Sequence, residues 1–69
     1  MLVLSRREGE LIYIGIPQGD GSYQMVEIKV VSIRAANVSV GITAPQEYVI
    51  HRQEVWEEIE QEGGLARRV

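Results

Sequence analysis

Residues 23–43 read YQMVEIKVVSIRAANVSVGIT and contain the clearest periodicity in the chain. Apolar and polar side chains alternate over 23–33, and the alternation resumes over 38–43 after the turn-like residues RAAN at 34–37. A period of two is typical of β-strands with one apolar face and one wet face. The pattern therefore predicts two strands joined as a hairpin by a short turn.

Two further strands are expected on the N-terminal side. Residues 1–6, MLVLSR, form a short apolar run, and LIYIGI at 11–16 is rich in β-branched and aromatic residues. Gly9 lies in the charged turn between them, so these two strands are also predicted to form a hairpin. Residues 17–22, PQGDGS, predict a loop, because Pro17 lacks a backbone donor and the two glycines permit positive φ.

The C-terminal side predicts one more strand and a single helix. EYVIH at 47–51 is a short fifth strand, and QEVWEEIEQE at 53–62 has apolar residues spaced for one helix face. Glu54 suits the first turn of this helix through the macrodipole. Two glycines end it, and residues 63–69 are expected to be a flexible tail. The predicted fold is mainly β, with five short strands and one C-terminal helix in one domain at 1–62.

The size of the chain predicts self-association. A chain of 69 residues buries only about 60% of its unfolded surface, so a core of one chain is marginal. The sequence has no cysteine and a single histidine, so disulfides and a Cys/His zinc site are excluded as stabilising devices. No apolar run reaches the roughly 18 residues that span a bilayer, and the N-terminus lacks a signal-peptide cleavage pattern. We expect a dimer or larger oligomer in the cytoplasm.

The charge distribution leaves room for a small basic site. The net charge is −3, but residues 1–53 are balanced and the acidic excess lies in 54–69. If the fold brings Arg6, Arg7 and Arg52 together, they form a cationic patch suited to nucleic acid. No nucleophile–base pair, metal-ligand cluster or phosphate loop is present in the sequence. We therefore expect no enzyme activity, no metal and no cofactor.

The stretches MLVLSRREGE at 1–10, VGITAPQE at 40–47 and VIHRQEV at 49–55 carry a specific pattern. In these residues the chain resembles the bacterial carbon storage regulator family (CsrA, RsmA or RsmE). The resemblance implies an interlocked, strand-exchanged homodimer, in which the first and last strands of one protomer insert beside the middle strands of the other. It implies a shared cleft in which Arg6 and Arg7 meet the partner's Arg52.

The resemblance also implies a function. The family binds GGA motifs in hairpin loops of messenger RNA leaders, and it represses translation or alters transcript stability. Regulatory small RNAs with GGA motifs and, in some bacteria, a FliW-like protein antagonist are implied as further partners, and no membrane is involved. The RNA contacts carried over onto matching positions are Leu4, Ser5, Arg6, Arg7, Ala44, Pro45, Ile50, His51 and Arg52.

Departures from the family pattern leave alternatives open. Residues 17–25 form a longer connection, which is either a longer hairpin, an added contact surface or an inert loop. Gln46 stands where many members have lysine, and Tyr48 replaces a small aliphatic residue and could stack on a base. Together with the acidic helix, these departures motivate an alternative: a diverged protein-interaction module that has lost RNA binding and acts through a protein partner.

Some residues also have a plain structural interpretation. Leu4 and Ile50 are core residues by default, and an RNA contact is the alternative interpretation of each. Trp56 is expected to pack the helix against the sheet and not to stack on a base.

Overall fold

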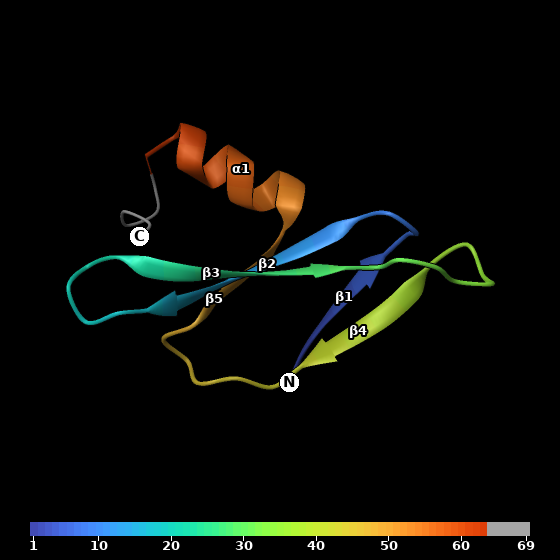
Figure 1. The fold of residues 1–69 in the computed structure, drawn as a ribbon, viewed down its shortest axis with the longest axis horizontal. Helices are drawn as coiled ribbons and strands as arrows, with labels where there is room; N and C mark the ends of the chain where they lie inside the picture. Colours follow the sequence, from blue (N-terminus) through green and yellow to red (C-terminus); the bar gives the residue numbers. More distant parts are fainter. Residues whose placement is uncertain (64–69) are drawn as a thin grey trace.

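The computed structural model describes residues 1–63 and contains five strands followed by one helix (Figure 1). The strands are β1 (Leu2–Arg6), β2 (Leu11–Pro17), β3 (Tyr23–Lys29), β4 (Val38–Ile42) and β5 (Val49–Arg52), and the helix is α1 (Gln53–Gln61). The mainly β class with a C-terminal helix is therefore confirmed. The expected flexible tail lies, from residue 64 onward, outside the described residues.

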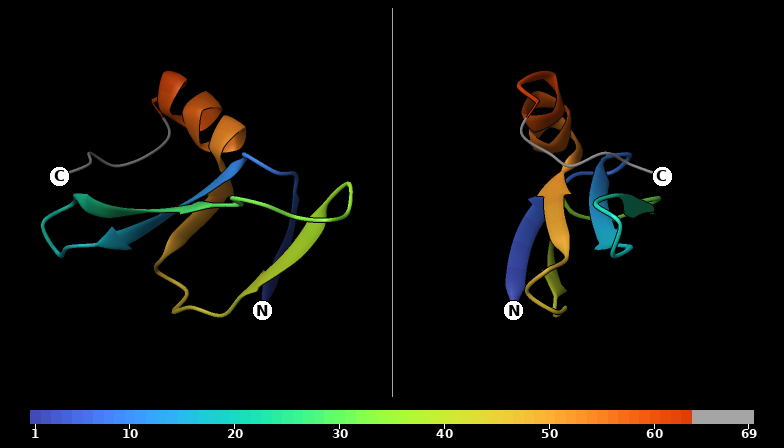
Figure 2. Two further views of the ribbon diagram at one scale, coloured as in Figure 1. Left: turned by 45° about the vertical axis from the view of Figure 1, so that its right-hand side comes forward. Right: turned by 90° about the vertical axis from the view of Figure 1, so that its left-hand side faces the viewer.

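The strands form two antiparallel sheets. One has two strands in the order β1-β4, and the other has three in the order β3-β2-β5 (Figure 1). In the second sheet, β2 is the central strand, and Ile14 faces both Val26 on β3 and Ile50 on β5. Because β5 continues directly into α1, the helix lies beside the β2 and β5 strands of this sheet (Figure 2).

Both hairpins predicted from the sequence, between 1–6 and 11–16 and between 23–33 and 38–43, are wrong. The structure pairs β1 with β4 and β2 with β3, whereas the sequence predicted β1 with β2 and β3 with β4. The reason lies at the end of β3, where Gly9 donates to the Val30 carbonyl at 2.6 Å and Val30 donates to the Glu10 carbonyl at 3.0 Å. The β1–β2 turn thus satisfies the backbone that would otherwise continue β3 toward β4, and β3 ends at Lys29 instead of 33.

The connection at 17–25 is resolved as part of a hairpin. Strands β2 and β3 pair as far as Pro17 and Tyr23, and Gln18 donates to the Ser22 carbonyl at 3.0 Å. The Asp20 carboxylate accepts hydrogen bonds from the hydroxyl and backbone N–H of Ser22, and the hydroxyl bond lowers the pKa of Asp20. Residues 17–25 therefore belong to the β2–β3 hairpin, whose tip projects away from the rest of the chain (Figure 2).

The core is small and centres on the helix. Trp56 and Ile12 are fully buried, while Leu4 and Tyr13 are each 8% exposed. The Trp56 ring lies edge-on to Tyr13 at a centroid distance of 5.9 Å, so the helix is anchored on β2. The radius of gyration is 12.7 Å, compared with about 11 Å for a compact chain of this length. Large apolar side chains, among them Val3 and Val31, stay exposed.

Candidate functional site

The fold brings the two basic segments together within one chain. Arg52, at the end of β5, donates from Nε to the Ser5 carbonyl on β1 at 3.3 Å. The register explains this, because Arg52 pairs with Ile12 at the start of β2, directly after the turn that follows β1. Arg52 thus already meets β1 within one chain, and the cleft shared with a partner's Arg52 stays a prediction. Strand exchange and the dimer stay predictions.

Arg6 lies beneath this surface and is not free. Its side chain is only 5% exposed, and Nη1 and Nη2 donate to the two carboxylate oxygens of Glu54 in a bidentate pair. Nη1 also donates to the Leu11 carbonyl at 3.0 Å, and Nε donates to the Ser5 carbonyl at 3.1 Å. Glu10 adds an ion pair at 3.6 Å. Arg6 therefore joins the end of β1 to the start of β2 and to the first turn of α1.

The Arg6–Glu54 pair also sets the protonation of both groups. The hydrogen bond from Arg6 lowers the pKa of the Glu54 carboxyl, and the hydrogen bond to Glu54 raises the pKa of Arg6. Sequence reasoning assigned Glu54 only to the helix dipole and missed this pairing. Glu54 lies in the HRQEV stretch, two residues after Arg52, and this position was a signal of a role near the basic residues. Its separation of 48 residues from Arg6 hid the partner.

Arg7 and Arg52 are the accessible cations of this region. Arg7 is exposed, and its guanidinium makes no ion pair within residues 1–63, although its backbone N–H donates to Glu10 at 2.7 Å. Arg52 is half-buried and bonded through Nε. A polar depression of about 330 Å³ opens here; its lining residues are Ser5, Arg6, Arg7, Glu10, Asn37 and Glu54.

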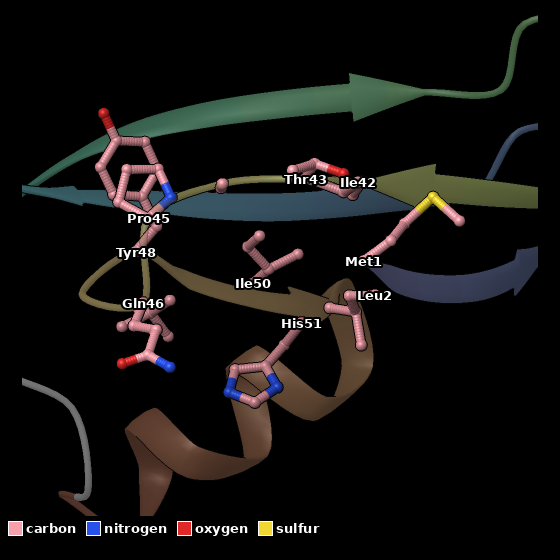
Figure 3. Close-up of a pocket in the computed structure, with 11 residues that line it drawn as sticks. Met1, Leu2, Ile42, Thr43, Pro45, Gln46, Tyr48, Ile50 and His51 are labelled. Atoms are coloured by element: carbon pink, nitrogen blue, oxygen red, sulfur yellow. The ribbon is translucent and has the colours of Figure 1, made fainter.

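A second, mainly apolar pocket of about 430 Å³ lies between the start of β1, the end of β4 and β5 (Figure 3). The predicted residues Ala44, Pro45, Ile50 and His51 line it, and so does Tyr48. Figure 3 shows Ile50 directed into the pocket, while His51 points toward the helix. Its ring lies 6.4 Å from that of Trp56. Gln46, which also lines the pocket, is exposed and offers an amide donor and acceptor.

The predicted site residues therefore divide into groups. The group at the end of β1 and directly after it, Ser5 to Arg7, lines the polar depression, and the group at 44–45 and 50–51 lines the apolar pocket. Arg52 links them, because it follows His51 on β5 and contacts Ser5 on β1. Leu4 lines neither and is buried in the core. Charged groups beside an open apolar and aromatic surface suit an unpaired, unstacked nucleic-acid strand.

Other kinds of site find no support in the residues that the structure describes. Over 1–63 there is no helix long and apolar enough to cross a membrane. In the same range no group of three histidine or acidic side chains is arranged to hold a metal ion.

Comparisons with known proteins extend over nearly the whole chain. The family described as CsrA, a global regulator protein family, matches residues 1–61. The chain is 44% identical to the Translational regulator CsrA of Alkaliphilus oremlandii over 68 residues, which cover 99% of this chain and 81% of that protein. It is 39% identical to that of Treponema pallidum over 66 residues, which cover 96% of this chain and 80% of the relative. No solved structure matches the chain.

Proposed function

The chain belongs to the CsrA global regulator family, and from this premise we propose that it regulates translation by binding GGA motifs in the hairpin loops of messenger RNA leaders. A regulator bound near the ribosome-binding site blocks the ribosome and represses translation. It can also alter transcript stability. Small RNAs that carry the same motif would compete for the protein, and a FliW-like protein is a candidate antagonist.

The observation that carries the proposal is the meeting of Arg52 with the end of β1. Arg52 contacts the Ser5 carbonyl, and Arg7 lines the same depression as Ser5. Arginine clamps phosphate oxygens better than lysine does because its donors form a planar fork. The apolar pocket, which is lined by His51 beside Arg52 on β5, offers surface for one unstacked base. Phosphate binding and base binding are thus available side by side.

Arg6 has a different part in this proposal from the one that the resemblance implied. Its guanidinium already holds the Glu54 carboxylate and is 5% exposed, so direct contact with a phosphate would require Glu54 to leave. We assign phosphate contact to Arg7 and Arg52 and leave direct RNA contact by Arg6 as a prediction.

We further propose that the regulator acts as a homodimer in the cytoplasm. The small core, the exposed apolar side chains on β1 and the two-stranded β1-β4 sheet support this proposal, because an open two-stranded sheet is marginal in isolation. Two sites per dimer would raise avidity for an RNA that carries two suitably spaced motifs, since the second engagement becomes intramolecular.

Arg52→Ala is expected to abolish most RNA binding and to leave the fold intact. The substitution removes one of two accessible guanidinium groups without opening a core cavity, so an affinity loss of about 30-fold or more is expected. The measurement is a gel shift with a hairpin that carries GGA in its loop, beside the same hairpin with CCA. Circular dichroism and sedimentation of the variant show whether fold and assembly are retained.

Equal binding of the two hairpins by the wild-type chain would contradict motif recognition. Undetectable binding of either hairpin would remove the RNA proposal and favour the protein-interaction alternative. An unchanged affinity of the Arg52→Ala variant would show that the site lies elsewhere on the molecule.

A further inference from the structure

One backbone carbonyl connects the buried and the accessible arginine. The Ser5 carbonyl accepts a hydrogen bond from Arg6 Nε at 3.1 Å and another from Arg52 Nε at 3.3 Å. The two guanidinium groups approach this oxygen from different elements, since Arg6 belongs to β1 and Arg52 ends β5. The position of the carbonyl therefore decides where the Arg52 side chain is held.

Glu54 holds the Arg6 guanidinium at its far end from Nε, the atom that binds the Ser5 carbonyl. It binds both terminal nitrogens of Arg6, and its side chain is itself 61% exposed. The pKa of Glu54 is lowered first by the Arg6 hydrogen bond, and the charge of Arg52 lowers it further. Without Glu54, the only ion pair left to the buried Arg6 guanidinium within residues 1–63 would be the longer one to Glu10 at 3.6 Å, which is a costly arrangement that favours its movement toward solvent.

We propose that Glu54 is a positioning residue for RNA binding, which holds Arg6 and thereby keeps the Ser5 carbonyl in place to orient Arg52. The inference rests on the proposed function, because it explains how the accessible arginine is prepared for a phosphate. An arginine anchored through Nε keeps its terminal nitrogens in a defined plane and loses less freedom when it binds.

Simple electrostatics predicts the opposite effect of Glu54. A carboxylate beside a phosphate-binding surface repels RNA, so its removal should strengthen binding if charge alone mattered. The positioning role predicts weaker binding when the same charge is removed. The sign of the change therefore separates the two interpretations.

The test is the isosteric variant Glu54→Gln, with Glu58→Gln as the matched control. Glu58 is an exposed residue of the same helix, and its substitution changes the net charge equally. In gel shifts with the GGA hairpin, Glu54→Gln is expected to bind about tenfold more weakly than the wild type. Glu58→Gln is expected to bind as the wild type does or slightly more tightly. Tighter or unchanged binding by Glu54→Gln would overturn the inference.

A double-mutant cycle distinguishes positioning from general damage to the fold. If Glu54 acts through Arg52, adding Glu54→Gln to Arg52→Ala causes no further loss of affinity. If Glu54 only stabilises the protein, the two losses multiply, and that result would also overturn the inference. All affinities are measured well below the unfolding temperature of each variant.

A measurement without RNA keeps this inference separate from the proposed function. The Nε–H group of Arg52 gives its own NMR signal, and its hydrogen bond to Ser5 predicts slow exchange with solvent. Glu54→Gln should speed this exchange severalfold, whereas Glu58→Gln should leave it unchanged. If the wild type fails to bind the hairpin but the exchange responds as expected, the proposed function fails and the orientation of Arg52 by Glu54 stands. If the exchange does not respond, the inference itself fails.

Discussion

Trp56 is the side chain on which the small core depends. It is fully buried, it packs edge-on against Tyr13, and its ring lies over the backbone of Gly15 on β2. The sequence predicted that this residue packs the helix and does not serve as a stacking surface, and its burial confirms the packing role. A glycine is needed beneath it because a Cβ at position 15 would lie 2.7 Å from the ring.

Gly15→Ala is therefore expected to destabilise the protein by about 1–3 kcal/mol through overpacking. The Trp56 ring cannot move aside easily, because it is enclosed on its other faces. Urea unfolding followed by Trp56 fluorescence measures the effect. Gly41→Ala is the matched control, since the nearest atoms to its Cβ belong to the exposed, flexible side chain of Met1. This substitution should cost less than about 0.5 kcal/mol. Equal effects of the two substitutions would contradict the packing argument.

Arg6 shows how burial changes the meaning of a residue. In the sequence it is one of two adjacent arginines at a strand end, and the resemblance implied an RNA contact for both. In the structure Arg6 is the last residue of β1 and is buried with Glu54, whereas Arg7 follows the strand and is exposed. Two adjacent and equal charges therefore acquire different roles.

At the scale of elements, α1 is stable only because two strands hold it. A helix of nine residues is marginal in water, and this one has no side-chain cap at its N-terminus. Trp56 fastens it to β2, and Glu54 fastens its first turn to Arg6 on β1. The helix thereby connects the two sheets, which share no paired strand.

The ion pair between α1 and β1 predicts a pH dependence of stability. Arg6 lowers the pKa of Glu54 below its ordinary 4.5, so the stabilising contribution is complete above pH 4.5 and is lost as the pH falls through the lowered value. The melting temperature of the wild type should therefore exceed that of Glu54→Gln by a few degrees at neutral pH. The gap should close in acid. Thermal unfolding of both proteins between pH 7 and pH 2 checks this, and a gap that stays constant would count against the pair.

At the scale of the whole molecule, a small cationic region must act against a net charge of −3. The acidic excess belongs to the C-terminal segment, and the accessible cations of the site are Arg7 and Arg52. Attraction of RNA is therefore local, and salt should screen it in proportion to the number of phosphates that are neutralised.

The salt dependence of RNA affinity reports how many arginines neutralise phosphates. Two phosphate contacts per site predict that log affinity falls with log salt at a slope of about −1.4, so fourfold more salt weakens binding about sevenfold. Three contacts would give a slope of about −2 and a loss of about 20-fold. Titrations of the GGA hairpin from low to moderate salt distinguish these values. A slope of −2 or steeper would mean that Arg6 leaves Glu54 and joins the interface.

Local patterns predicted the elements well and their pairing badly. The strand expected at 11–16 is found as Leu11–Pro17, and the helix expected at 53–62 is found as Gln53–Gln61. The hairpin expected between 23–33 and 38–43 is absent, because the turn around Gly9 takes the backbone groups of Val30. A period of two identifies the faces of a strand but contains no information about its neighbour.

For the candidate site, the sequence motifs pointed to the candidate residues, and the fold decided which role each can have. The sequence alone determined which segments become strands and helix, where the chain turns and where the basic residues lie, because these depend on local backbone preferences and side-chain spacing. Only the tertiary structure decided that β1 pairs with β4, that Glu54 takes Arg6, and that Arg52 reaches Ser5. These contacts join residues more than 30 positions apart, and they depend on burial and on competition for hydrogen bonds across the whole chain.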